Sequence, residues 1–124
     1  MGTAEYLLVL YIAEQREGAP VAPGDVAARL GRSPSATTEM LQRLDARGLI
    51  AYEPYEGATL TEFGRDTAHD VYETYRILSQ FFRDVLGLEA YDAEAMQLAG
   101  TISKSVAERL AATLLVSESS PAPP

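Results

Sequence analysis

The chain has 124 residues, 47% of them hydrophobic, and carries a formal net charge of −8. That length and composition support one domain or two small subdomains with a real core. Cysteine is absent, so disulfides, thiolate chemistry and cysteine-based metal sites are excluded. No apolar run is long enough to span a bilayer and no signal pattern opens the chain, so we expect a cytoplasmic location.

The charge is unusual in kind as well as in size. Lys and Arg total 10 against 18 Asp and Glu, and Lys104 is the only lysine. An acidic, lysine-poor surface is typical of a salt-rich cytoplasm, where a Debye length of about 3 Å weakens like-charge repulsion. The composition therefore favours a halophilic source, and an ordinary acidic protein is the alternative.

The first half of the chain predicts three helices and a hairpin. Apolar residues at helical spacing predict helices over 3–17, 23–30 and 34–47. Capping and terminating residues mark their ends: Gly18, Pro23, Gly31, Ser33, Pro34 and Gly48. The β-rich segments 49–54 and 58–60, joined by a YEGA turn, predict a two-stranded wing.

The second half predicts further helices. Thr61 caps a long helix to about residue 86, and another helix covers about 92–102. A last helix starts at Ser103 or Ser105 and reaches about residue 116, because Ser105 and Glu108 have the spacing of a capping box. Residues 117–124 predict a disordered tail. The expected fold class is mainly α, with a winged helix-turn-helix over 1–61 and helices over 62–116.

The third helix predicts a face that contacts DNA. Small and hydroxyl side chains can approach base edges, and a helix N-terminus can bind phosphate. The residues predicted to approach the bases or backbone are Ser33, Ser35, Ala36, Thr37, Thr38, Glu39 and Gln42. Those predicted to contact phosphate are Arg32, Arg43 and Arg47, together with the wing around Tyr55 and Gly57. The alternative is that Ser and Thr only cap the helix and the arginines form a solvated face.

The charge is partitioned along the chain in a way that favours DNA binding. Residues 24–48 hold four arginines against three acids, a local charge of +1. Residues 49–73 hold one arginine against six acids, a local charge of −5. At molar salt counterion release contributes little, so affinity would depend on hydrogen bonds, apolar contact and shape.

Four stretches carry a family resemblance: AEYLLVLY, SPSATTEMLQRLDARGLIAYEPYEGATLTEFG, YRILSQFFRDVLGL and EAMQLAGTISKSVAERL. With them the chain, from about residue 3 to 115, resembles the diphtheria toxin repressor (DtxR) family of metal-dependent repressors, including its short manganese-regulator branch. The resemblance implies a homodimeric winged-helix repressor on a palindromic operator. Residues 62–116 would then be the dimerisation domain.

The resemblance also implies positions for ligands of Fe²⁺ or Mn²⁺. These positions hold Glu5, Leu8, Tyr75, Met96, Ala99 and Gly100, and ancillary ligands fall at Ser79 and Asp92. A carboxylate with a phenol and a thioether does not supply the oxygen and imidazole ligands that these metals prefer. We therefore expect the usual metal site to be lost and assign no cofactor.

Other ligand sets remain open. Glu5, Asp92 or Glu94 could hold a metal in a rearranged site, and so could His69 with the acidic residues around it, Asp66, Asp70 and Glu73. A solvated acidic helix face is the alternative for the His69 cluster. Apolar residues of the long helix indicate a core or a dimer interface rather than a ligand pocket: Tyr75, Leu78, Phe81 and Phe82.

We interpret the chain as a sequence-specific DNA-binding transcriptional regulator, most simply a repressor. Its partners would be double-stranded DNA and a second copy of itself, with no membrane partner. One histidine, no cysteine and no paired acids leave little catalytic chemistry, so an enzyme is not expected. Two competing interpretations are a metal-responsive repressor with a rearranged site and a protein-interaction module, which Glu39 and the overall acidity favour.

Overall fold

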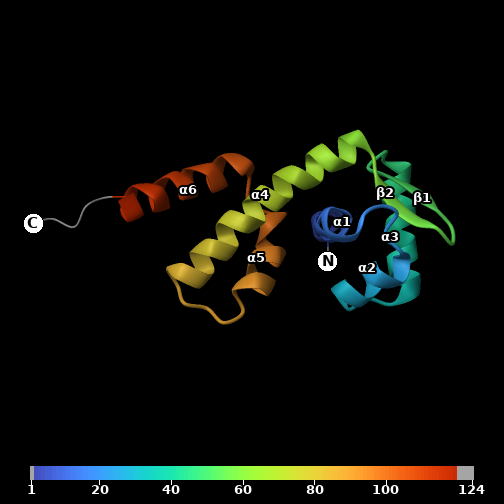
Figure 1. The fold of residues 1–124 in the computed structure, drawn as a ribbon, viewed down its shortest axis with the longest axis horizontal. Coiled ribbons are helices and arrows are strands. Elements are labelled where there is room, and N and C mark those ends of the chain that lie inside the picture. Colours follow the sequence, from blue (N-terminus) through green and yellow to red (C-terminus); the bar gives the residue numbers. More distant parts are fainter. Residues whose placement is uncertain (1, 120–124) are drawn as a thin grey trace, which may run out of the picture. The chain divides into compact units, whose positions relative to one another are not determined.

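The structure is a computed structural model that describes residues 2–119, with side chains described up to residue 113. It is mainly helical with one small hairpin (Figure 1). The elements are α1 (Thr3–Glu17), α2 (Pro23–Leu30), α3 (Pro34–Ala46), β1 (Ile50–Glu53), β2 (Gly57–Leu60), α4 (Glu62–Asp84), α5 (Tyr91–Ala99) and α6 (Lys104–Ser119). The chain forms two compact units that divide after Val71.

The core of the first unit is built around α1. Five consecutive residues of this helix are buried, from Tyr6 to Leu10, and so is Ala13. A surface helix buries only one stripe, whereas α1 packs against both α2 and β2 and is therefore buried on most sides. Leu41 and Leu44 of α3 and Ile50 of β1 complete this core.

The wing is a β1–β2 hairpin that a third segment extends. Ile50 pairs with Leu60 and Glu53 with Gly57 in an antiparallel register. On the other edge of β2, Val21 forms a bridge with Ala58 through two backbone hydrogen bonds of 2.8 and 2.9 Å. The sequence did not predict this bridge, because Val21 belongs to the connection between α1 and α2.

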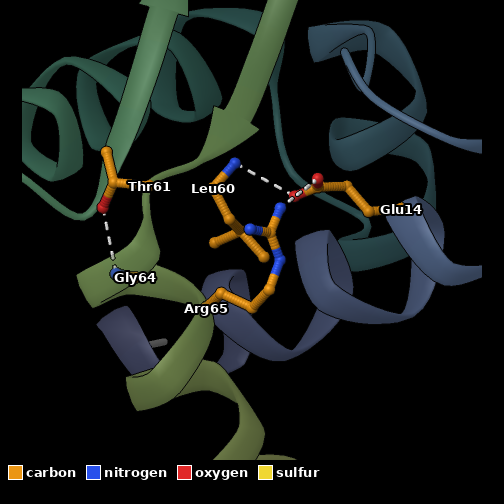
Figure 2. A network of polar contacts seen from close by, with 5 residues as sticks. All are labelled: Glu14, Leu60, Thr61, Gly64 and Arg65. Atoms are coloured by element: carbon orange, nitrogen blue, oxygen red, sulfur yellow. Dashed lines mark hydrogen bonds and ion pairs between the residues drawn. The ribbon is translucent and has the colours of Figure 1, made fainter.

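A carboxylate of α1 joins the wing to α4. The Glu14 side chain is only 9% exposed, and its Oε2 accepts a hydrogen bond of 3.0 Å from the backbone N–H of Leu60. Its Oε1 lies 3.1 Å from the guanidinium of Arg65 (Figure 2). Ala58 and Leu60 point their N–H groups to the same edge of β2, so Val21 and Glu14 together satisfy that edge.

The start of α4 is fixed by Thr61 and Gly64. The Thr61 hydroxyl accepts a hydrogen bond from the Gly64 N–H at 3.0 Å and donates to the Gly48 carbonyl at 2.7 Å. The Thr61 N–H also donates to the Leu49 carbonyl, at 3.1 Å. Gly64 lies against that residue so closely that a Cβ here would sit 1.7 Å from the Leu49 oxygen. The predicted Thr61 cap is therefore present, and Gly64 is required by a close backbone approach.

The first turns of α4, up to Val71, belong to the first compact unit. The predicted domain boundary follows residue 61, whereas the compact units divide after Val71. The difference has a physical reason: Arg65 pairs with Glu14, Ala68 is buried, and His69 contacts Tyr11 of α1.

The second unit holds the rest of α4 with α5 and α6. Its buried residues are Thr74, Leu78, Ala95, Ala99 and Ala107. α4 ends at Asp84 rather than residue 86, and α5 covers Tyr91–Ala99 rather than 92–102.

Ser103 caps α6: its Oγ accepts a hydrogen bond of 3.2 Å from the Val106 N–H. Of the two predicted starts, the one at Ser103 is therefore the observed one, and Ser105 lies inside the helix. The helix continues to Ser119, past the predicted start of the tail at residue 117. The rest of that predicted tail, residues 120–124, lies outside the described residues.

We expect Gly64→Ala to lower the free energy of unfolding by about 3 kcal/mol, because the new Cβ meets a backbone oxygen that cannot rotate away. Gly24→Ala is the matched control, since nothing lies within 4 Å of a Cβ at that helical position. It should leave stability unchanged or raise it by up to about 1 kcal/mol. Denaturant titrations followed by circular dichroism measure both, and equal midpoints for the two variants would contradict the assigned contact.

Candidate nucleic-acid interface

The turn before α3 fixes where that helix begins. Gly31 ends α2 in the left-handed conformation, with φ 63°, and the Arg32 N–H donates to the Ala27 carbonyl at 3.0 Å. Ser33 is extended and its hydroxyl accepts a hydrogen bond of 3.1 Å from the Ala36 N–H, while Pro34 is the first helical residue. The first turn of α3 contains no acidic residue, so nothing offsets the positive end of the helix dipole there.

The outer side of α3 carries most of the residues predicted to face DNA. Ser35, Glu39 and Gln42 are exposed, and Ala36 and Thr38 are partly exposed. They recur at intervals of three and four residues, which places them on one side of the helix. This surface, named here the α3 outer face, presents hydroxyl, amide, methyl and carboxylate groups together.

Two predicted contact residues are buried and do not belong to this surface. Thr37 has no exposed area, because it lies on the same side of α3 as the buried Leu41 and Leu44. Gly57 is buried in the wing, where a Cβ would lie 2.4 Å from the Val21 carbonyl oxygen. Both predictions are corrected: Thr37 is a core residue, and Gly57 allows the close approach of Val21.

Arginines flank the α3 outer face. Arg32, Arg43 and Arg47 are all exposed, as a phosphate contact requires. Arg47 also donates from Nη1 to the Thr3 hydroxyl, at 3.3 Å. The side chain therefore has a partner within its own unit that a phosphate would share or replace.

The tip of the wing is an exposed aromatic residue between acids. Tyr55 is 104% exposed and adopts a φ of 71°, a left-handed conformation that is uncommon for a residue other than glycine. Glu53 and Glu56 on either side are exposed as well. At the tip of the wing a phosphate would meet one phenol hydroxyl and two carboxylates that repel it. The wing is therefore a poorer phosphate contact than the arginines.

Two sequence profiles together cover nearly the whole chain. The N-terminal DNA binding domain of the iron dependent repressors matches residues 2–58, and their metal binding and dimerisation domain matches residues 61–122. The chain belongs to the iron-dependent repressor family. This confirms the predicted resemblance, and members of the family are transcriptional regulators rather than enzymes.

Relatives of known sequence agree with this membership. An uncharacterised helix-turn-helix transcriptional regulator of Methanocaldococcus jannaschii is 33% identical over 108 residues, which is 86% of each chain. The transcriptional regulator MntR of Geobacillus kaustophilus is 31% identical over 96 residues, which cover 68% of this chain and 67% of that protein.

Solved structures of other regulators share the fold of this chain. A manganese-dependent transcriptional repressor in complex with manganese superposes with a TM-score of 0.81 at 28% identity, over 91% of this chain and 52% of that one. The manganese regulator SloR gives a TM-score of 0.78 at 26% identity, over 91% and 53%. The chain thus spans about half the length of these structures, and the predicted winged helix-turn-helix with a helical second part is confirmed.

The positions that the family resemblance assigns to metal ligands hold few of the side chains that iron or manganese prefers. Ala99 and Gly100 supply no ligand atom, and Met96 supplies only a thioether. The Tyr75 hydroxyl donates a hydrogen bond to the Asp92 carboxylate. Burial raises the pKa of Tyr75 above that of an ordinary phenol, and the hydrogen bond to Asp92 raises it further. A phenol that holds its proton is a poor metal ligand.

The alternative ligand sets do not converge either. Among the side chains of residues 2–113 no group of three or more histidine and acidic residues lies close enough to hold a metal ion. His69 instead contacts Tyr11, with 3.0 Å between Nδ1 and the phenol oxygen and the rings inclined at 60°. This contact ties α4 to α1 within the first unit.

The predicted dimer interface contains one core residue. Leu78 is only 2% exposed in the single chain, so it has little surface to offer a partner and is removed from the set. Tyr75, Phe81 and Phe82 remain partly exposed. Sequence reasoning missed the large apolar residues that are most exposed in the second unit: Val85, Leu86, Leu88, Leu98 and Val106. Val85 and Leu86 fall at the end of the predicted long helix and follow α4 in the structure, while Leu88 lies in the connection to α5.

None of the helices in the described part of the chain combines the length and apolar composition that a membrane span requires.

We expect Thr37→Val to raise the free energy of unfolding by about 1 kcal/mol. The Thr37 hydroxyl is buried and has no hydrogen-bond partner among the described residues, and valine keeps its shape without the polar group. Thr38→Val, at the neighbouring and partly exposed position, is the control and should change stability by less than about 0.5 kcal/mol. Thermal unfolding in concentrated KCl compares them; a loss of stability in Thr37→Val would show that the hydroxyl has a partner.

Proposed function

We propose that this iron-dependent repressor homologue is a homodimeric, sequence-specific transcriptional repressor that binds a palindromic operator without the usual iron or manganese site. The α3 outer face of each protomer enters the major groove of DNA, and Arg32 and Arg43 contact the phosphates. The protein acts on the chromosome in a salt-rich cytoplasm.

The observation that carries this proposal is the chemistry of the α3 outer face. Its hydroxyl, methyl and amide groups can contact base edges, and the Ser33 cap leaves the helix N-terminus exposed with no acid in its first turn. The arginines beside it provide phosphate contacts, although the whole chain carries a charge of −8. At molar salt the long-range repulsion is screened, so short-range contacts decide affinity.

Dimerisation is supported by the second unit. Val85, Leu86 and Leu88 are more than one-third exposed, which is uncommon for clustered apolar residues on a monomer. The family profile over residues 61–122 describes a dimerisation domain. Two copies related by a two-fold axis would place two α3 helices on successive major grooves, which is why a palindromic operator is expected.

A protein-interaction module is the second candidate function, and the acidic wing favours it. Glu53 and Glu56 beside the fully exposed Tyr55 disfavour phosphate and suit a basic protein surface. Genome-wide occupancy separates the two functions, since a repressor gives discrete peaks over a shared palindrome and an interaction module gives none.

Arg43→Ala and Thr38→Val should separate phosphate contact from base contact. Arg43→Ala removes one cation, so affinity should fall for all duplexes and the salt dependence should flatten by about one counterion. Thr38→Val keeps the shape but loses the hydroxyl, so it should change preference at one base position, by about 1 kcal/mol for one lost hydrogen bond. Selection from randomised duplexes in concentrated KCl measures both, and wild-type behaviour of both variants would rule out the α3 outer face.

Glu39→Gln tests the one acid on that surface. A carboxylate only accepts hydrogen bonds and therefore pairs with the amino group of cytosine, whereas an amide also donates and pairs with adenine. We expect the preferred base facing position 39 to change from cytosine to adenine, and overall affinity to rise because a negative charge is removed. Asp45→Asn, near the other end of α3, is the control with the same charge change and should leave base preference unaltered.

A further inference from the structure

Contacts between protein side chains join α4 to α5 in the second unit. The Tyr75 hydroxyl donates to the Asp92 carboxylate. The Arg83 guanidinium lies 5.7 Å from the centre of the Tyr91 ring, within range of a cation–π contact. Two adjacent residues at the start of α5 are therefore held by two side chains of α4.

The turn between these helices is closed by backbone hydrogen bonds. The Leu86 N–H donates to the Phe81 carbonyl at 3.2 Å, and the Leu88 N–H donates to the Phe82 carbonyl at 2.9 Å. Gly87 supplies the left-handed residue that this helix ending needs, with φ 63°. These backbone hydrogen bonds thus fix the end of α4. The Tyr75 and Arg83 contacts hold the start of α5 against α4.

Tyr75 is suited to a lasting hydrogen bond. Its side chain is partly buried, and a tyrosine phenol is a hydrogen-bond donor throughout the physiological pH range. An ionised carboxylate acceptor makes the bond stronger than one between neutral groups.

In this segment the family profile describes a metal binding domain, yet among the side chains that the structure describes no three histidine or acidic groups lie close enough to hold a metal ion. A bound cation would draw ligands from several helices toward one point. Here the phenol of Tyr75 and the carboxylate of Asp92 instead form a hydrogen bond with each other.

We propose that the hydrogen bond from Tyr75 to Asp92 holds the start of α5 on α4 without a metal ion, and that the metal-free chain is the form that binds DNA. Tyr75 and Asp92 are positioning residues in this scheme. The second half of the proposal rests on the proposed function, whereas the first half does not.

Hydrogen–deuterium exchange of the metal-free full chain in concentrated KCl tests the contact directly. Tyr75→Phe removes only the hydroxyl, and the amides of α5 should then exchange about three to ten times faster, which is the range for one lost hydrogen bond. Ser79→Ala, one turn further along α4, removes a hydroxyl outside the pair and should leave α5 exchange unchanged.

Asp92→Ala and the double variant complete a mutant cycle. Because Tyr75 and Asp92 act as one contact, the double variant should exchange no faster than either single variant. Rates that multiply in the double variant would show independent effects and overturn the pairing. Equal exchange in Tyr75→Phe and Ser79→Ala would overturn it as well.

Binding to a genomic operator, with a chelator or with added Mn²⁺ or ferrous ion, tests the second half. Affinity should agree within twofold across the three conditions. A tenfold increase with either metal, or slower α5 exchange when metal is added to the wild type, would overturn the proposal. A chain that binds no DNA in any condition contradicts the proposed function, and the exchange experiment still decides the role of Tyr75.

Discussion

The first unit depends on one nearly buried carboxylate. Glu14 sits on the central helix α1, where an unpaired charge would be costly, and it is satisfied by the Leu60 N–H and the Arg65 guanidinium. The three groups come from α1, β2 and α4, so a single side chain fixes the end of the wing relative to the core and to the next helix. Thr61 and Gly64 extend this junction to the β1 strand through Gly48 and Leu49. The LTEFG stretch is therefore a junction sequence rather than a ligand site.

That junction has a consequence for the surface opposite it. Since α2 and β1 pack against one side of α3, Thr37, Leu41 and Leu44 face inward and the α3 outer face is left to solvent. Five of the eleven acids in residues 1–71 lie in the wing and α4, and the first turn of α3 holds none. An acidic protein can in this way keep one helix end free of negative charge, and high salt reduces what the remaining charge costs.

Sequence predicted the parts of the fold that are decided locally. Pro23, Gly31, Ser33 and Pro34 bound their helices as expected, because caps and backbone conformation depend on neighbouring residues. What it missed depends on distant partners. No local signal shows that Val21 reaches Gly57 and Ala58. Thr37 is a different kind of error, because it precedes Leu41 and Leu44 by four and seven residues and this spacing already indicates the buried side. The five residues of the α3 outer face were all among those predicted to face DNA, and their contacts with DNA remain a proposal.

The second unit keeps the helices of the family's metal binding and dimerisation domain, and contacts within the protein close the connection between two of them. The same helices α4 and α5 form, and their connection is closed by Leu88 and Phe82 and by the cation–π contact of Arg83 with Tyr91. A metal would make this arrangement depend on ion concentration, because binding to one state shifts the equilibrium by the ligand's free energy. Contacts between the protein's own side chains do not make the arrangement depend on ion concentration. If Tyr75 and Asp92 replace the metal, the amount of protein and the salt concentration become the variables that set operator occupancy.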